Sequence, residues 1–176
     1  MKKIVIILSI ILIVVISNNT TDDLLIPDEA IRIRVIANSN SFEDQAIKKM
    51  VKDNLEHEIT KILEDANDIN DAREIIKSNM NNIEDNVKQT LSNNGYSSEY
   101  TINYGYNLFP NKKYKGVTYK EGYYESVVIT LGNGSGDNWW CVLFPPLCAL
   151  ESDQNNVGEV EYKSFIKEII NKYFKN

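Results

Sequence analysis

The chain has 176 residues and a formal net charge of −6, from 19 Lys and Arg against 25 Asp and Glu. An acidic chain neutralises phosphates poorly, so we expect no nucleic-acid partner. The hydrophobic fraction of 43% and the ten tyrosines argue against a disordered chain, and two cysteines with one histidine cannot supply the four ligands of a structural zinc site. We therefore expect a folded domain without a metal or cofactor.

The first 17 residues have the pattern of a signal peptide or signal anchor. Two lysines precede an apolar run over residues 4–16, which begins at Ile4, ends at Ile16 and is interrupted only by Ser9. As a helix, these residues would rise about 20 Å, less than the roughly 30 Å of a bilayer core. We expect export, with the run as a membrane anchor unless it is cleaved. Residues 18–27 are then a tether, and residues 28–176 the exported domain.

The first elements of this domain are a strand and a long helix. Residues 31–35 alternate apolar and basic side chains, which predicts a half-buried strand. Ser41 is a suitable N-cap, with Glu43 and Asp44 in the first turn of the helix that follows. The apolar stripe of that helix comprises Ile47, Met50, Val51, Leu55, Ile59, Ile62 and Leu63.

The rest of the chain predicts one more long helix, three strands and a final helix. The second helix begins near Asp71 and ends at Gly95, which suits the left-handed residue after a helix. Strands are expected at residues 100–106, 123–131 and 139–144, and the last helix at 162–173. The order β-α-α-β-β-β-α predicts a single α+β domain with a four-stranded sheet, and three helices against one face.

Three interpretations fit Cys141 and Cys148: a catalytic thiol, a disulfide, or two buried free thiols. A thiol hydrolase needs a base beside its thiolate. The single histidine, His57, lies between two glutamates on a predicted helix, so we interpret it as a solvent-exposed residue and not as a catalytic base. Cys141 and Cys148 could instead form a disulfide across the turn at Pro145 and Pro146, which an exported protein permits. Two buried free thiols are an equally good interpretation.

The most unusual stretch of the sequence runs from Trp139 to Cys148. Successive side chains of a strand point to opposite faces, so Trp139 and Trp140 face one core only if the sheet is covered on both sides. We expect one tryptophan at a surface, and we predict a partner-binding site there. A strand buried on both faces and a sugar-stacking platform are the alternatives. The predicted partner-binding residues are Trp139, Trp140, Phe144, Pro145, Pro146 and Leu147.

A glycine-rich stretch, Gly-Asn-Gly-Ser-Gly, precedes this segment at residues 132–136. It lacks the Lys and Ser/Thr of a phosphate-binding loop, and a strand follows it where that motif needs a helix. We predict a flexible turn between two strands, and no small-molecule substrate.

Three stretches resemble the stage II sporulation protein R family. The first comprises residues 31–39 with 43–46, and the second Phe109, Pro110, Tyr114, Gly122 and Tyr124. The third and most specific covers residues 132–148 and reads Gly-x-Gly-x-Gly-x-Asn-Trp-Trp-Cys-Val-Leu-Phe-Pro-Pro-Leu-Cys.

The resemblance implies a non-enzymatic signalling protein of sporulation. Such a protein is exported from the forespore into the intermembrane space, where it activates a membrane-embedded aspartic protease that processes pro-sigma-E in the mother cell. It is released there or stays anchored by its N-terminal segment. The alternative is an exported thiol-dependent hydrolase that uses Cys141.

Overall fold

The central sheet of the computed structural model has four strands in the order β3-β6-β2-β7. These are β2 (Ile31–Ile36), β3 (Tyr100–Phe109), β6 (Gly122–Leu131) and β7 (Asn138–Phe144). β2 lies parallel to β6, and the other two neighbouring pairs are antiparallel. The structure describes residues 24–148 and 158–174, so the predicted signal or anchor lies outside the described residues. No helix within the described residues has the length and apolarity needed to span a membrane.

A second sheet, which the sequence did not predict, has three short strands in the order β1-β5-β4. They are β1 (Leu24–Leu25), β4 (Lys112–Tyr114) and β5 (Val117–Tyr119), and β1 belongs to the stretch predicted as a tether. The β4–β5 turn has positive φ at Lys115 and Gly116, as the type I′ turn of a two-residue hairpin requires. Strands of two or three residues are too short to show an alternating pattern, which explains why they were missed.

The described residues contain four helices, where three were predicted. They are α2 (Phe42–Ile62), α3 (Ile69–Ser78), α4 (Met80–Asn93) and α6 (Glu159–Phe174). The expected N-cap at Ser41 is confirmed, because its side chain accepts a hydrogen bond from the Asp44 backbone amide.

The predicted second helix is in fact two helices, α3 and α4, which meet at Asn79. The Asn79 side-chain amide donates to the Ile75 carbonyl at 2.8 Å and so competes with the helix for that acceptor. An unbroken apolar stripe does not reveal such a break, because both helices keep their apolar sides toward the same sheet.

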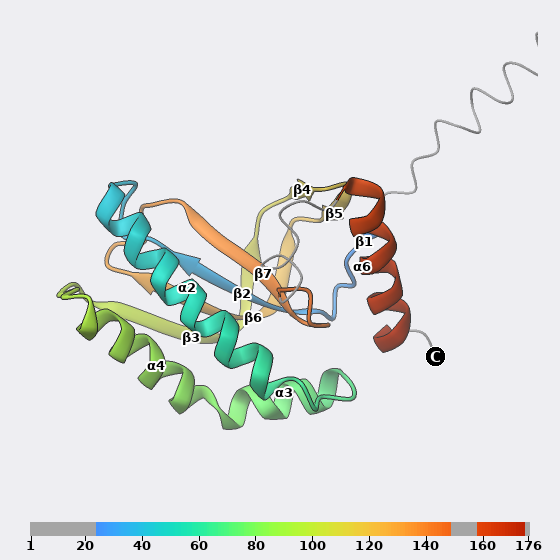
Figure 1. Ribbon diagram of the computed structural model, residues 1–176, viewed down its shortest axis with the longest axis horizontal. Helices are drawn as coiled ribbons and strands as arrows, with labels where there is room; N and C mark the ends of the chain where they lie inside the picture. Colours follow the sequence, from blue (N-terminus) through green and yellow to red (C-terminus); the bar gives the residue numbers. More distant parts are fainter. Residues whose placement is uncertain (1–23, 149–157, 175–176) are drawn as a thin grey trace, which may run out of the picture.

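The two faces of the central sheet are covered by different elements (Figure 1). α2, α3 and α4 pack on one face, over the apolar residues of β2, β6 and β7. The other face carries a second core, to which the small sheet and α6 contribute. The prediction of an α+β domain is confirmed, whereas the expectation that all helices lie on one face is wrong for α6.

A partly buried ion pair fastens α3 to the central sheet. Arg73 of α3 donates from Nε and Nη2 to the Glu125 carboxylate of β6, both at 2.8 Å, and Tyr104 of β3 donates its hydroxyl to the same group. Burial on its own would raise the pKa of Glu125, but these hydrogen bonds outweigh it and hold that pKa below its usual value. The ionised carboxylate therefore stabilises the folded state.

Replacing Glu125 by Gln tests this contribution. The folded state lowers the pKa of Glu125, so the ionised carboxylate stabilises the fold at neutral pH. This stabilisation is lost as the pH falls through the folded-state pKa. Loss of a charge-assisted pair should lower the free energy of unfolding by about 2 kcal/mol at pH 7. Urea unfolding of wild type and variant should show the gap closing toward pH 3.

The matched control is Glu74→Gln, which removes an exposed carboxylate paired with Lys77 and should have little effect at either pH. An equal gap for Glu125→Gln at pH 7 and pH 3 would contradict this role for the ion pair.

Candidate functional site

Trp139 and Trp140 of β7 point to opposite faces of the central sheet, as the sequence predicts. They pair in register with Val35 and Arg34 of β2. Trp139 lies on the side of α2 and is half-buried, whereas Trp140 belongs to the second core and is 6% exposed. Both faces of the sheet are covered at this point, so only Trp139 reaches the surface.

Trp140 belongs to an aromatic cluster that encloses a buried cation, Arg32. The Trp140 ring meets Phe109 and Tyr119 edge to face, at centroid distances of 5.5 and 5.0 Å. Arg32 Cζ lies 3.3 Å from the centroid of the Tyr124 ring and 5.6 Å from that of Trp140.

The guanidinium of Arg32 depends on these rings for its stabilisation. Its side chain is fully buried, and none of its three nitrogens has a hydrogen-bond partner among the described residues. Burial lowers the pKa of Arg32, while the faces of aromatic rings attract the charged form. The alternating pattern had predicted a half-buried strand, and it did not reveal that Arg32 lies within a core.

The structure joins Cys141 and Cys148 by a disulfide, with 5.6 Å between their Cα atoms. Both cysteines are buried. In this form neither sulfur is a free thiolate, so neither can act as the nucleophile of a thiol hydrolase.

The disulfide closes the turn that carries most of the predicted partner-binding residues. Phe144 and Leu147 are fully buried and Pro145 is buried, whereas Pro146 is half-buried. The Phe144 ring lies 4.8 Å from that of Tyr173, centroid to centroid, so the turn packs against α6. Partner binding by this segment stays a prediction, and only Trp139 and Pro146 expose enough of their side chains to touch a partner directly.

Trp139 lines a cleft of about 510 Å³ whose described lining has basic residues and no acidic ones. We name it the Trp139 cleft; it is lined by Gln45, Lys48, Lys49, Lys52, Tyr114, Asn138 and Trp139. Lys52 Nζ lies 5.4 Å from the centroid of the Trp139 ring. Lys48 donates to the backbone carbonyl of Asp137 at 3.1 Å, and burial lowers its pKa. Lys49 and Lys52 pair with Asp53, and Lys52 also pairs with Glu56, so Lys48 is the cation best placed to meet a carboxylate beside the Trp139 ring.

Helical spacing explains the lysines of this cleft. Lys52 lies four residues after Lys48 and three after Lys49, so all three share one side of α2. The sequence alone does not single them out, because lysines on a helix usually form a solvated surface. Their proximity to Trp139 appears only in the fold.

Pro146 lines another cleft, of about 650 Å³, between α2 and α6. Its lining includes the apolar residues Leu63, Ile169 and Tyr173, and also His57. The two accessible residues of the predicted segment thus lie in different clefts.

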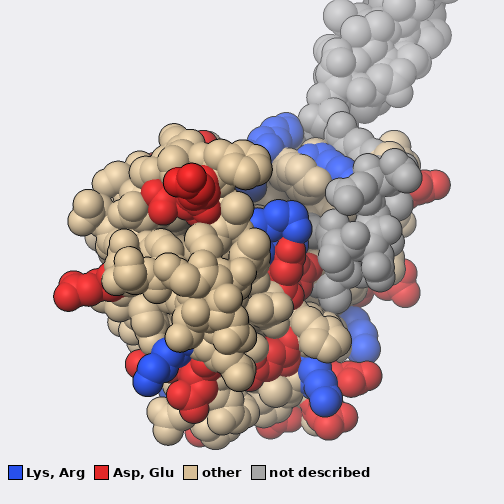
Figure 2. All heavy atoms as spheres, turned by 60° about the vertical axis from the view of Figure 1, so that its left-hand side comes forward, with Lys and Arg blue, Asp and Glu red and all other residues tan. Residues whose placement is uncertain are grey.

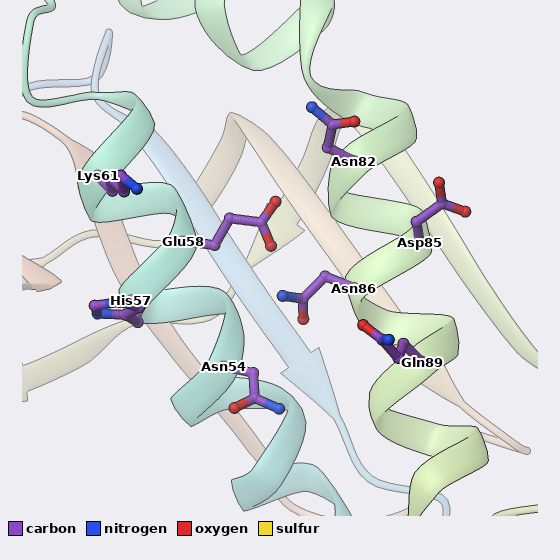
Figure 3. Close-up of a pocket in the computed structure, with 8 residues that line it drawn as sticks. All are labelled: Asn54, His57, Glu58, Lys61, Asn82, Asp85, Asn86 and Gln89. Carbon is purple, nitrogen blue, oxygen red and sulfur yellow. The ribbon is translucent and has the colours of Figure 1, made fainter.

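His57 also lines a polar groove of about 610 Å³ between α2 and α4, which Figure 3 shows in detail. Glu58 of α2 and Asn86 of α4 point toward each other across this groove, whereas His57 projects from the side of α2 away from α4 (Figure 3). No cysteine lines the groove, and the described residues contain no group of three metal-binding side chains. The arrangement gives His57 no nucleophile to activate within this groove.

The glycine-rich turn at residues 132–136 joins β6 to β7, and the loop after β2 holds it in place. The Asn38 side-chain oxygen accepts a hydrogen bond from the Asn133 amide at 2.9 Å, and Gly136 donates its amide to the Ala37 carbonyl, also at 2.9 Å. Asp44 accepts hydrogen bonds from Ser39 and Asn38, which lower its pKa. Two of the stretches that carry the family resemblance therefore meet at this end of the sheet.

The conformation and close packing of this turn require glycine, as Gly132 and Gly136 show. Gly132 has φ of 53°, and a Cβ there would collide with the Asn38 side chain. A Cβ at Gly136 would collide with the backbone carbonyl of Ser39. The turn was predicted to be flexible, but close packing against the Asn38 loop determines its conformation.

Gly132→Ala should lower the free energy of unfolding by about 1–3 kcal/mol, because alanine would be strained at this φ and would displace Asn38. Gly105→Ala is the matched control: a Cβ there meets no atom within 4 Å, so stability should stay the same or rise slightly. Thermal unfolding followed by circular dichroism compares the two variants. Equal stabilities would show that the turn tolerates a side chain.

Comparisons with known proteins agree with the resemblance in the sequence. A model of the family described as stage II sporulation protein R matches residues 27–154. Stage II sporulation protein R of Bacillus subtilis (strain 168) is 42% identical over 146 residues, which cover 82% of this chain and 65% of that protein. The chain thus aligns with just under two thirds of the length of its curated relative. No solved structure gives a significant match.

Proposed function

The chain belongs to the stage II sporulation protein R family, and we propose that it is the exported signal that activates the membrane-embedded aspartic protease processing pro-sigma-E in the mother cell. The observation that carries this proposal is the match over residues 27–154, which includes the tryptophan segment and the glycine-rich turn. The protein would be exported from the forespore into the intermembrane space. There it would be released or held by residues 4–16.

We propose a binding role without catalysis by this chain. The buried disulfide gives Cys141 no free thiolate, and His57 has no nucleophile in its groove. Activation by binding requires the signal to bind the active state of the protease more tightly than the inactive state. A tenfold shift toward the active state needs a tenfold difference in affinity, which is about 1.4 kcal/mol.

The Trp139 cleft is the surface that best supports such a contact. It combines a large, partly exposed aromatic ring with lysines, and interface energies concentrate on buried aromatic anchors with neighbouring charges. We propose that an acidic segment of the protease enters this cleft. Pro146 and its separate cleft would extend the contact toward α6.

In sporulating cells that lack this protein, the full chain should restore pro-sigma-E cleavage, and Trp139→Ala should reduce it about tenfold or more. The reduction follows from the loss of an interface anchor, which costs about 2 kcal/mol in binding. Immunoblotting for the precursor and the mature sigma factor measures both effects. Trp140→Ala is unsuitable for this test, since it would disrupt the buried Arg32 cluster.

Two controls separate binding from folding. Phe42→Ala removes an exposed aromatic ring of α2 that does not line the cleft, and should leave cleavage unchanged. Lys48→Glu reverses a charge inside the cleft and should reduce cleavage. Its control is Lys88→Glu on α4, which makes the same charge reversal outside the cleft and should leave cleavage unchanged. A folded Trp139→Ala with normal cleavage would exclude Trp139 from the contact. An exported wild-type chain that restores no cleavage would overturn the proposed function.

A further inference from the structure

β3 is a long edge strand whose outer side no described strand covers. It lies first in the order β3-β6-β2-β7, and its ten residues pair with β6 in one continuous register from Tyr100 to Phe109. A regular edge of this length presents a row of backbone donors and acceptors to another chain.

The features that normally protect an edge strand are absent from β3. Its sequence, Tyr-Thr-Ile-Asn-Tyr-Gly-Tyr-Asn-Leu-Phe, contains no charged residue and no proline, and its pairing with β6 has no bulge. The opposite edge strand, β7, is shorter, has a register irregularity opposite Ile31 and Arg32, and is followed by Pro145. β3 is therefore the edge open to pairing.

The sequence of β3 is symmetric about Gly105. Residues 103–107 read Asn-Tyr-Gly-Tyr-Asn in both directions, and Ile102 and Leu108 extend the symmetry with two apolar residues of similar size. In an antiparallel pair of two β3 strands centred on Gly105, Tyr104 would lie opposite the partner's Tyr106. Asn103 would lie opposite the partner's Asn107, and Ile102 opposite the partner's Leu108.

We propose that a second copy of this chain pairs with β3, with a twofold axis at Gly105, and joins the two central sheets into one. Such an isologous contact places like residues together without opposing any charges. A Cβ at Gly105 would meet nothing within 4 Å, so no neighbouring side chain of the same copy obstructs a partner strand at the axis.

The exposure of side chains on β3 agrees with this arrangement. Tyr106 is 71% exposed and Leu108 is 50% exposed, although both lie on the same face of the strand as the packed residues Tyr104 and Ile102. In the pair, the partner's Tyr104 and Ile102 would cover them. Figure 2 shows, at the end of the molecule where β3 begins, a broad area without charged side chains.

Single cysteines introduced into the full chain, in mild detergent, test the axis directly. Opposed residues of antiparallel strands have Cα atoms about 4.5–5.5 Å apart, within the range that a disulfide spans. Gly105→Cys should therefore form a disulfide-linked dimer on mild oxidation. Asn103→Cys and Asn107→Cys should each remain uncrosslinked alone and should crosslink when the two variants are mixed.

Light scattering measures the association itself. Gly105→Lys would place two lysines opposite each other, so it should weaken dimerisation at least tenfold while the circular dichroism spectrum stays unchanged. Gly105→Ala is the control and should keep the dimer. A wild-type chain that is monomeric at tens of micromolar would overturn the proposal. So would a dimer that crosslinks without regard to these positions, which would leave β3 available to a strand of another protein.

Discussion

The alternation of side chains along β7 is the constraint on which the rest of this structure depends. Because Trp139 and Trp140 are neighbours in a strand, they lie on opposite faces of the sheet, and two large aromatic rings need a layer on each face. α2 supplies the layer over Trp139, and the small sheet with α6 supplies the one over Trp140. The second layer also encloses Arg32, whose guanidinium faces aromatic rings and has no hydrogen-bond partner among the described residues.

This constraint divides the tryptophan segment into a structural part and an accessible part. Trp140 and Leu147 hold β7 and the disulfide-closed turn against the second core, whereas Phe144 belongs to the core on the other face and contacts Tyr173 of α6. Trp139 lines the Trp139 cleft, and Pro146 lines the separate cleft between α2 and α6. The part that can recognise a partner is thus small and is held on a rigid strand and turn, which favours a specific contact over a broad apolar one.

The sequence predicted the features that depend on local pattern. The α+β class, the N-cap at Ser41, the four strands of the central sheet and the opposed tryptophans all follow from periodicity or capping. Sequence reasoning missed what depends on distant contacts: the three short strands, the break at Asn79, the burial of Arg32 and the approach of Lys48 and Lys52 to Trp139. A buried arginine and an exposed one give the same pattern along a strand, because only the layer above the strand distinguishes them.

We propose that the folded domain, and not the N-terminal apolar run, is the signal. The most direct measurement is to export residues 18–176 from the forespore with an unrelated, cleavable secretion signal, in cells that lack the native protein, and to quantify pro-sigma-E cleavage. The account predicts that cleavage is restored. A folded and exported domain that restores no cleavage would contradict it and would make residues 1–17 part of the signal.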